Sequence, residues 1–498
     1  MTPHPAPLPP GEGAERAAGI LLHVSALPSP FGVGDLGPGA VRFLDWAAAA
    51  GQSLWQVLPL GPTGGGDSPY GGASAFAGNP LFISPERLVE EGWGEGEGFS
   101  AARQLKEHVL RRAFERFRTA AAPQSRRDFD EFRSAPAQAS WLPDGSLYEA
   151  LRRRAGGAGW IAWEPPLANR DAATLNEARR ALAPEIEFTE WTQFVFFRQW
   201  ERLRAEAARR GIRIVGDLPI YVAHDSADVW AHRELFALDE RFLPERVAGV
   251  PPDYFSETGQ LWGYPVYRWE AHAASGWAWW TERLRANLRL ADAVRIDHFR
   301  GFASFWEVPA GERTALNGRW APGPGRALFD AAAKALGGAP LPVIAEDLGF
   351  ITPDVTALLD ELGFPGMKVL QFAFSEDDSP HLPHRHVENA VVYTGTHDND
   401  TTSGWAKTLS KAERDRFLLY TGMPPDAAAL LRLAYESVAR WAIAPMQDVL
   451  ALPSSARMNT PGLAEGNWRW RARESDFTAE NAAQLRRLAK VTGRIESR

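Results

Sequence analysis

The stretch ADAVRIDHFRGF (residues 291–302) begins as a short apolar run and then places four ionisable side chains within six positions: Arg295, Asp297, His298 and Arg300. Side chains on a β-strand alternate between its two faces, so Arg295 and Asp297 share one face and the apolar residues before each of them share the other. The apolar face suits packing under helices. The charged face suits a strand end that opens on a wet cleft. The stretch therefore predicts a buried strand whose carboxyl end carries a functional site.

Eight short apolar runs of this kind end in polar residues. They are ILLHVSAL (20–27), SLWQVLPL (53–60), IRIVGDLP (212–219), AVRIDH (293–298), PVIAED (342–347), MKVLQFAF (367–374), AVVYTGTHD (390–398) and AIAPMQD (442–448). Amphipathic helical patterns separate most of them, and this alternation predicts a parallel sheet with both faces covered. Eight strand–helix units predict an α/β fold of the closed (β/α)₈, or TIM barrel, type. A doubly wound open sheet is the alternative, and it is disfavoured because no glycine-rich fingerprint follows the first strand.

Two spacings between these runs are too long for simple crossovers. Residues 61–190 contain their own helical patterns and predict a mainly helical insertion subdomain. Residues 220–275 are rich in proline, glycine and aromatic residues, without a helical period, and predict a long loop that acts as an active-site lid. Residues 1–17 are proline-rich and predict a flexible tail, which leaves residues 18–498 as the catalytic barrel that the two insertions interrupt.

Composition excludes several classes of protein. The 498-residue chain has a net charge of −8, which argues against a nucleic-acid surface and against an anionic membrane. It has no cysteine, so disulfides, thiolate nucleophiles and cysteine metal ligands are excluded. The chain has neither a signal-peptide pattern nor an apolar run long enough to span a membrane, and a cytoplasmic protein is therefore expected.

Polar residues end at least five of the predicted strands, and in a barrel these ends meet at one mouth. The set comprises Asp217, Arg295, Asp297, Glu346, Asp347, His397, Asp398, Asp400, Gln447 and Asp448. A single aspartate at such a position is more often a helix cap than a catalyst. Several carboxylates crowded beside Arg and His are more specific, because like charges at one site repel and shift each other's pKa values.

Retaining glycosyl transfer is one reaction that uses such crowding. It needs a carboxylate nucleophile and a second carboxyl group that serves as general acid and base. Arg295 beside Asp297 would keep a nucleophile ionised, and the partly apolar setting of Glu346 would raise the pKa of an acid. A metal site at HDND (397–400) is the competing interpretation, and one His with nearby carboxylates is weak evidence for it.

The longer stretches resemble the amylomaltases, the 4-α-glucanotransferases or disproportionating enzymes of the wider α-amylase superfamily. AVRIDHFRGF, IAEDLG and YTGTHDNDT resemble the three strands that carry the superfamily's catalytic carboxylates. The stretches most similar to the narrower family are DSPY…SAFAGNP (67–80), GDLPIYVAHDSADVW (216–230), AGVPPDYFSETGQLWG (248–263), PMQDVL (445–450) and ARMNTPG…GNWRWR (456–471). Together they span nearly the whole chain.

The resemblance implies Asp297 as the nucleophile, Glu346 as the acid/base and Asp398 as the stabiliser of the transition state. It implies a substrate-binding set of Ser68, Tyr70, Asp217, Tyr254, Phe255, Gln260, Trp262, Arg295, His298, His397 and Asn467. It implies no cofactor and no metal.

Three short stretches of the chain depart from the family's pattern. Gly65 stands where an aromatic residue often follows GPTG and marks a secondary glucan contact. Gly71 and Gly72 stand where bulkier residues usually follow DSPY. Tyr264 stands where we expect Asn in the sequence W-G-N-P.

The function that these features predict is transfer of a segment of a 1,4-α-glucan to the 4-hydroxyl of another glucan or of glucose, by a retaining double displacement. The expected substrates are maltooligosaccharides and amylose, with glucose as an acceptor, and a monomer is expected. A retaining glucan hydrolase with the same three carboxylates is the nearest alternative. A non-catalytic carbohydrate-binding protein and a metal-dependent barrel hydrolase are more distant ones.

Overall fold

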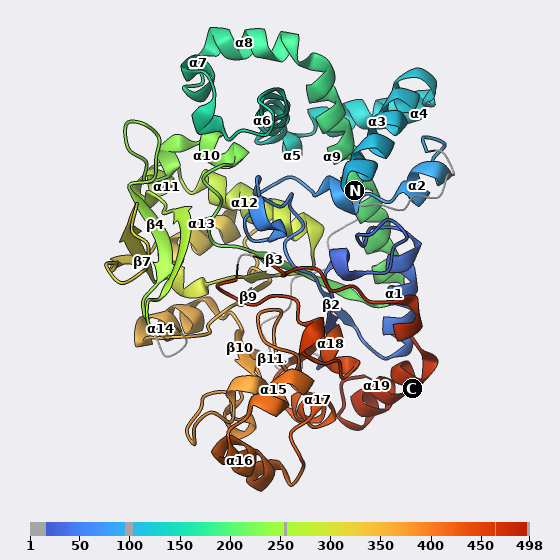
Figure 1. The fold of residues 1–498 in the computed structure, drawn as a ribbon, viewed down its shortest axis with the longest axis vertical. Coiled ribbons are helices and arrows are strands. Elements are labelled where there is room, and N and C mark those ends of the chain that lie inside the picture. The colour runs from blue at the N-terminus through green and yellow to red at the C-terminus, as the bar shows by residue number, and fades with distance from the viewer. Residues whose placement is uncertain (1–15, 95–102, 253–255, 464, 496–498) are drawn as a thin grey trace.

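The computed structural model describes residues 16–94, 103–252, 256–463 and 465–495. Its centre is an eight-stranded parallel sheet, and each strand falls in or beside one of the eight predicted runs (Figure 1). The strands are β1 (Ala17–Leu21), β2 (Leu54–Gln56), β3 (Arg213–Leu218), β6 (Ala293–Ile296), β9 (Val343–Ala345), β10 (Gly366–Val369), β11 (Ala390–Tyr393) and β12 (Trp441–Pro445). The predicted (β/α)₈ barrel is confirmed.

The strand order β10-β11-β12-β1-β2-β3-β6-β9 makes β9 and β10 the two ends of the sheet. They meet at a seam where the Ala345 N–H donates to the carbonyl oxygen of Pro365 at 2.9 Å. The Asp347 carboxylate adds a second link, because it accepts from the Met367 N–H at 2.6 Å. These bonds bring the open edges together and close the sheet into a barrel.

Alternate residues of each strand point to opposite sides of the barrel wall. One buried cluster fills the interior and includes Leu21, Val215, Ala293, Ile344 and Ile443. The intervening residues pack outward under the helices. Arg295 is two residues beyond the inward-facing Ala293 and therefore enters the barrel mouth, as the alternation predicts.

Helices cover the outside of the barrel wall and follow the strands for much of the chain. They include α1 (Pro38–Ala49), α12 (Ala278–Leu290), α13 (Arg326–Ala335), α14 (Pro353–Leu362), α15 (Thr402–Thr408), α16 (Lys411–Thr421), α17 (Ala427–Glu436), α18 (Met446–Val449) and α19 (Ala479–Val491). Their ends carry expected signals: proline opens α1 and α14, and the glycine after α14 has φ 67°, the left-handed conformation of a helix C-cap.

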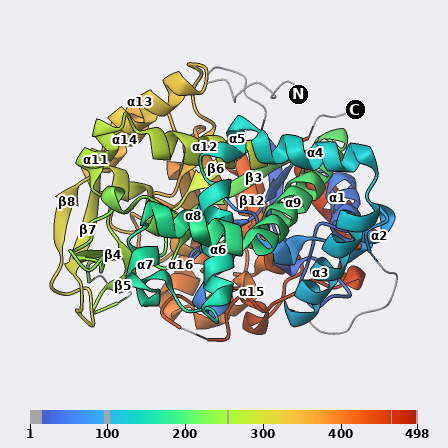
Figure 2. The ribbon, with the colours of Figure 1, turned by 90° about the horizontal axis from the view of Figure 1, so that it is seen from above.

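The segment between β2 and β3 is mainly helical and lies to one side of the barrel (Figures 1 and 2). Its helices are α2 (Pro85–Glu90), α3 (Arg103–Ala120), α4 (Pro123–Ser134), α5 (Pro136–Ala139), α6 (Leu142–Arg154), α7 (Pro165–Ala168), α8 (Ala172–Ala181) and α9 (Ala183–Arg209). The predicted boundary at residue 190 falls inside α9, since this helix serves both the insertion and the barrel wall.

Helix α9 also fixes the loop that follows β2. The Gln193 amide accepts from the Gly78 N–H at 2.8 Å and donates to the Gly78 carbonyl at 3.0 Å. Gln199 makes the same pair of bonds with Ser84. Both amides are buried, and each satisfies a donor and an acceptor of a loop with no sheet partner. The loop that carries Tyr70 is thus held at its far end.

The segment 220–275, predicted as a long loop, contains regular secondary structure. This segment contains α10 (Ala227–Ala231), β4 (Arg246–Val250), β5 (Gln260–Pro265) and α11 (Trp269–Ala274). Strands β4 and β5 join β7 (Ser304–Pro309) and β8 (Arg319–Pro322) in an antiparallel sheet of order β5-β4-β7-β8. Sequence periodicity missed this sheet because β4 pairs with β7, which is more than fifty residues away and beyond β6.

Two smaller points concern the start of the chain and the possibility of a membrane span. The predicted tail ends too late, because β1 begins at Ala17, and residues 1–15 lie outside the described residues. Within the described part of the chain, no helix is long and apolar enough to cross a membrane.

Candidate active site

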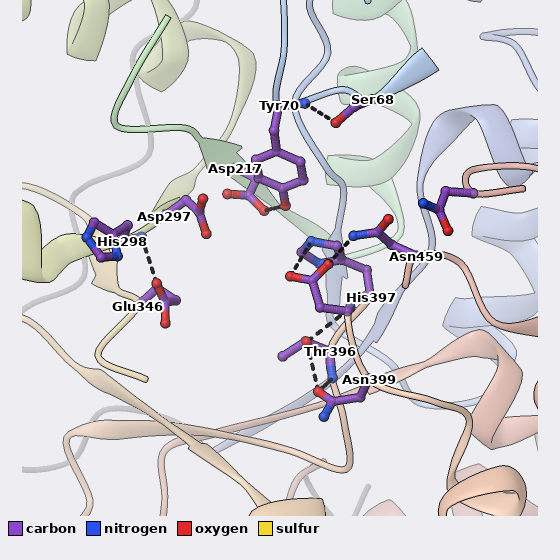
Figure 3. Close-up of polar contacts among 12 residues, drawn as sticks. Ser68, Tyr70, Asp217, Asp297, His298, Glu346, Thr396, His397, Asn399 and Asn459 are labelled. Carbon is purple, nitrogen blue, oxygen red and sulfur yellow. Dashed lines mark hydrogen bonds and ion pairs between the residues drawn. The ribbon is translucent and has the colours of Figure 1, made fainter. Parts of the chain in front are cut away.

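The carboxyl ends of β3, β6, β9 and β11 bring the predicted catalytic groups to one mouth of the barrel. Asp217 lies on β3 directly opposite Arg295 on β6, and Glu346 follows β9, the next strand in the sheet. In Figure 3, Asp297, His298 and Glu346 lie to one side of Tyr70 and Asp217, and His397 and Asn459 lie to the other. Four strands thus supply one site.

Arg295 organises the centre of this site. One of its guanidinium nitrogens donates to both oxygens of Asp217, at 2.8 and 2.9 Å, and the other terminal nitrogen donates to Asp297 at 2.9 Å. Arg295 and Asp217 are buried, whereas the Asp297 side chain is 30% exposed. Burial lowers the pKa of Arg295, but the two carboxylates raise it well above its usual range. Arg295 therefore stays charged and fixes one Asp297 oxygen, and the other oxygen accepts no hydrogen bond from the residues that the structure describes.

Glu346 has a different environment from Asp297. Burial and the negative charge of Asp297 raise the pKa of Glu346 to about 8, although Arg295 and two backbone N–H groups oppose the shift. Those groups are the N–H of His298, 2.7 Å from one carboxylate oxygen, and the N–H of Leu348, 2.9 Å from the other. Glu346 is therefore protonated at neutral pH and is held in one orientation, as a general acid requires.

His397 and Asp398 follow β11 and form the other wall of the site. The His397 ring stacks on the Tyr70 ring with centroids 5.1 Å apart and planes at 12°. The Tyr70 hydroxyl donates to Asp217 at 2.7 Å, so the stack is tied to the Arg295 network. Asp398 is 43% exposed and lies 3.4 Å from the Nε2 of His397. The arrangement offers a flat aromatic surface beside two open carboxylates, which suits a sugar ring.

The comparisons with known proteins agree with this geometry. A family model described as 4-alpha-glucanotransferase, glycoside hydrolase family 77, matches residues 22–476. The chain belongs to the 4-alpha-glucanotransferase family. It is 50% identical to the 4-alpha-glucanotransferase of Thermus thermophilus, over 96% of this chain and 99% of that protein. It is 49% identical to the Synechocystis enzyme of the same name, over 96% and 98%.

A solved structure gives the same result at the level of the fold. Amylomaltase from Streptococcus agalactiae, in complex with acarbose, superposes with a TM-score of 0.92 at 36% identity. The match covers 96% of this chain and all of that one. The protein is therefore a 4-α-glucanotransferase that acts on 1,4-α-glucans.

The remaining predicted binding residues of this glucanotransferase fall into three groups. Trp262 and Gln260 lie on β5, where the Trp262 ring meets the His298 ring edge to face at 4.7 Å. Ser68 and Asn467 make local bonds in loops, to Tyr70 and to Thr460 and Leu463. Tyr254 and Phe255 lie outside the described residues.

Four strand-end residues of the predicted set have structural contacts. Asp347 links the seam. Asp448 is buried and accepts from Thr394 and from the Thr402 N–H, both at 2.6 Å. Asp400 accepts from the N–H of Thr401 and from Ser454, and Gln447 donates to the Ala456 carbonyl. These groups hold the loops around the site in place, because the polar groups of the loops at a strand end need hydrogen-bond partners.

Two residues at the site of this glucanotransferase were not singled out from the sequence. The Asn459 amide donates to Asp398 at 2.6 Å, and the Asn459 N–H donates to the His397 carbonyl at 3.1 Å. Trp468 packs against Tyr70 and His397 at 6.1 and 5.9 Å, with a left-handed backbone, φ 63°. Both lie in ARMNTPG…GNWRWR, so the resemblance points to the segment, but strand-end reasoning does not reach a loop that follows the last strand.

No cluster of three or more His, Cys, Asp or Glu side chains with the geometry of a metal site occurs among the described residues.

Proposed function

We propose that this glucanotransferase works by a retaining double displacement in which Asp297 is the nucleophile, Glu346 the general acid and base, and Asp398 the stabiliser of the transition state. The observation that carries the proposal is the contrast between two neighbouring carboxyl groups. Asp297 is open to the cleft with one oxygen held by Arg295, whereas Glu346 has a pKa of about 8. Two carboxyl groups set apart in this way divide the roles of nucleophile and acid.

In the first step the free oxygen of Asp297 attacks the anomeric carbon while Glu346 gives its proton to the departing glycosidic oxygen. The 1,4-bond breaks, a glycosyl–Asp297 ester forms, and the glucan beyond the cleaved bond leaves with a new 4-hydroxyl. In the second step the ionised Glu346 takes the proton from an acceptor 4-hydroxyl, whose oxygen displaces Asp297. Both configuration and bond type are retained.

Asp398 would face the positive charge that develops on the sugar ring. Its carboxylate is 43% exposed, and Asn459 holds one of its oxygens. We infer that Asn459 positions Asp398, whose other oxygen lies 3.4 Å from the Nε2 of His397. Asp217, Arg295, Tyr70 and His397 would bind the ring next to the cleaved bond, since they form one bonded and stacked group beside Asp297.

The second sheet and the segment 220–275 would cover the acceptor side of the cleft. Support comes from Trp262, which lies against His298, the residue after the proposed nucleophile. Gln260, Tyr254 and Phe255 belong to the same lid by the resemblance, and residues 61–190 would form a helical subdomain beside it. A cover of this kind lowers the access of water to the glycosyl-enzyme and so favours transfer over hydrolysis.

Trapping the intermediate tests the assignment of Asp297. The E346Q variant is incubated with an α-maltosyl fluoride, whose fluoride departs without a proton from Glu346. Because deglycosylation still needs the base, a protein heavier by one maltosyl unit should accumulate, and peptide mass spectrometry should place that unit on Asp297. A label on Asp398, or on neither residue, contradicts the assignment.

Maltotriose distinguishes transfer from the alternative of hydrolysis. We expect glucose together with a ladder of longer maltooligosaccharides, and glucose and maltose alone would contradict the proposed lid. Maltooligosaccharides and amylose as donors, glucose as an acceptor, a monomeric state and a cytoplasmic location are further proposals that rest on the sequence. Light scattering and cell fractionation check the last two.

A further inference from the structure

Tyr264 lies on β5 of the second sheet, two residues beyond Trp262. The pairing of β5 with β4 is irregular between Leu261 and Pro265, and Gly263 has φ 78°. Trp262 meets the His298 ring at 4.7 Å, and His298 directly follows Asp297. Both aromatic residues also pack against the main core that surrounds the barrel wall. This part of β5 therefore borders the loop of the proposed nucleophile.

The Tyr264 hydroxyl reaches the loop on the opposite side of the site. A Cβ added at Gly71 would lie 3.1 Å from the Tyr264 hydroxyl oxygen. Gly71 directly follows Tyr70, whose own hydroxyl binds Asp217. Gly71 and Tyr264 are also two of the positions where the chain departs from the pattern that its resemblance predicts. The structure places them side by side, so a side chain at position 71 would meet the Tyr264 hydroxyl.

The hydroxyl of Tyr264 is available to a ligand. Among the described residues it has no hydrogen-bond partner, and its side chain is only partly buried. Burial and the negative charge of Asp297 raise its pKa, which keeps the hydroxyl neutral and able to donate. The influence of Asp297 also agrees with a place close to the nucleophile. A neutral, unpartnered donor beside a sugar site is the kind of group that recognises a sugar hydroxyl.

We propose that Tyr264 is a specificity-determining residue whose hydroxyl binds a hydroxyl group of the glucan ring beside Asp297, across the cleft between the second sheet and the Gly71 loop. The inference deepens the proposed function and rests on Asp297 as its nucleophile. The contact would favour a sugar over water in the covered site, because a bound glucan hydroxyl satisfies Tyr264 and fixes the ring.

The Y264F variant removes the hydroxyl and retains the ring. With maltotriose we expect kcat/KM for transfer to fall about tenfold, which corresponds to about 1.4 kcal/mol. The ratio of hydrolysis to transfer should rise, and the unfolding temperature should stay within experimental error. Y420F is the matched control: Tyr420 lies on α16, away from the cleft, and its hydroxyl accepts from the His384 N–H at 3.1 Å. This control should keep wild-type kinetics.

The G71A variant tests the contact between the two departing positions. In the wild-type background the added methyl group would lie 3.1 Å from the Tyr264 hydroxyl and push it aside by a few tenths of an ångström, so transfer should weaken. In Y264F the displaced atom is absent, and G71A should have no further effect. A double-mutant cycle of the two substitutions measures this coupling directly.

Three outcomes overturn the inference: Y264F within twofold of wild type, an equal loss in Y264F and Y420F, or additive effects of G71A and Y264F. The trapping of the glycosyl-enzyme on Asp297 is independent of Tyr264. A labelled Asp297 together with an inert Y264F therefore rejects the role of Tyr264 alone, whereas an unlabelled Asp297 rejects the proposed function on which that role rests.

Discussion

The two ends of the barrel each bury an arginine, and the two arginines are satisfied in different ways. At the mouth, Arg295 binds the carboxylates of Asp217 and Asp297. At the opposite end, Arg494 donates to six backbone carbonyl oxygens, among them those of Ala17 and Arg440, which lie at the starts of β1 and β12. Burial lowers the pKa of Arg494 to about 9, whereas the pKa of Arg295 is raised.

The difference indicates that one end of the barrel serves the reaction and the other end serves the stability of the fold. Arg295 is paired with two carboxyl groups, one of which remains partly exposed. Arg494 is paired with neutral dipoles that belong to the backbone, and it ties the C-terminal segment to the first and last strands. Side chains at the mouth should therefore control rate, and those at the other end should control the free energy of unfolding.

The largest effects should come from the two carboxyl groups at the mouth for which we propose direct roles in the reaction. D297N and E346Q should each lower kcat for maltotriose transfer roughly 10⁴-fold or more, about 5.5 kcal/mol of transition-state stabilisation. Steady-state rates check this, with circular dichroism as the control for folding. More than a tenth of wild-type activity in either variant would remove that residue from its role.

The next comparison replaces the two arginines themselves. R295M should abolish most transfer and also destabilise the protein by about 3–5 kcal/mol, because it leaves Asp217 buried and unpaired. R494M should destabilise by on the order of 3 kcal/mol through its unsatisfied carbonyls, with an unchanged kcat for the folded enzyme. Urea unfolding and initial rates measure the two quantities. A lowered kcat in fully folded R494M would contradict the expectation that this end of the barrel affects only the free energy of unfolding.

A smaller effect is expected from a residue that only orients a carboxylate at the barrel mouth. N459A frees the Asp398 carboxylate, and a misplacement of about 1 Å can cost on the order of 10²-fold in rate. We expect this loss in kcat with little change in KM. It should disappear in a D398N background, where nothing is left to orient. N389A, which removes an amide bound to the Gly363 carbonyl, is the control outside the site. A loss that persists in D398N would show that Asn459 acts elsewhere.

The pH dependence follows from Glu346. Because its pKa is about 8, kcat/KM should fall as the pH rises through 8 and the acid loses its proton. The folded state binds a proton that the unfolded chain releases above pH 4.5, so this group stabilises the fold fully below pH 4.5 and the contribution is lost as the pH rises to 8. E346Q should lack this slope in its unfolding free energy. An identical slope in both proteins would contradict the assignment.

The smallest effect should be that of a chelator. The proposed steps need no metal, so transfer should continue in EDTA at the rate of an untreated sample. Activity that EDTA removes and a divalent ion restores would contradict the double displacement described above.

Much of this arrangement could be predicted from the sequence because the barrel is built from local signals. Each strand is an apolar run, and polar residues at its end mark the mouth, so Asp217, Asp297 and Glu346 are found without a structure. The second sheet could not be found in this way. Its strands are short, and β4 must cross β6 in the sequence to reach β7, so the pairing leaves no local pattern.

The same limit applies to single residues. Asp448 and Asp398 both follow strands and look alike in the sequence, but Asp448 is buried under two threonine bonds and Asp398 faces the cleft. Asn459 contacts Asp398 from sixty-one positions away. The packing of the last loop on the β11 loop distinguishes the partly exposed Asp398, for which we propose a catalytic role, from the buried Asp448, which holds the loops together.

The seam of the barrel has a consequence for heat. Strand β9, which positions Glu346, is paired along its length with β6, but it meets β10 through the Ala345 bond and the Asp347 side chain. A closed sheet should open first where it has the fewest hydrogen bonds, and here that point adjoins Glu346. Warming should therefore loosen the proposed acid/base before the rest of the molecule unfolds, so that the temperature at which the enzyme stops working lies below the temperature at which it melts.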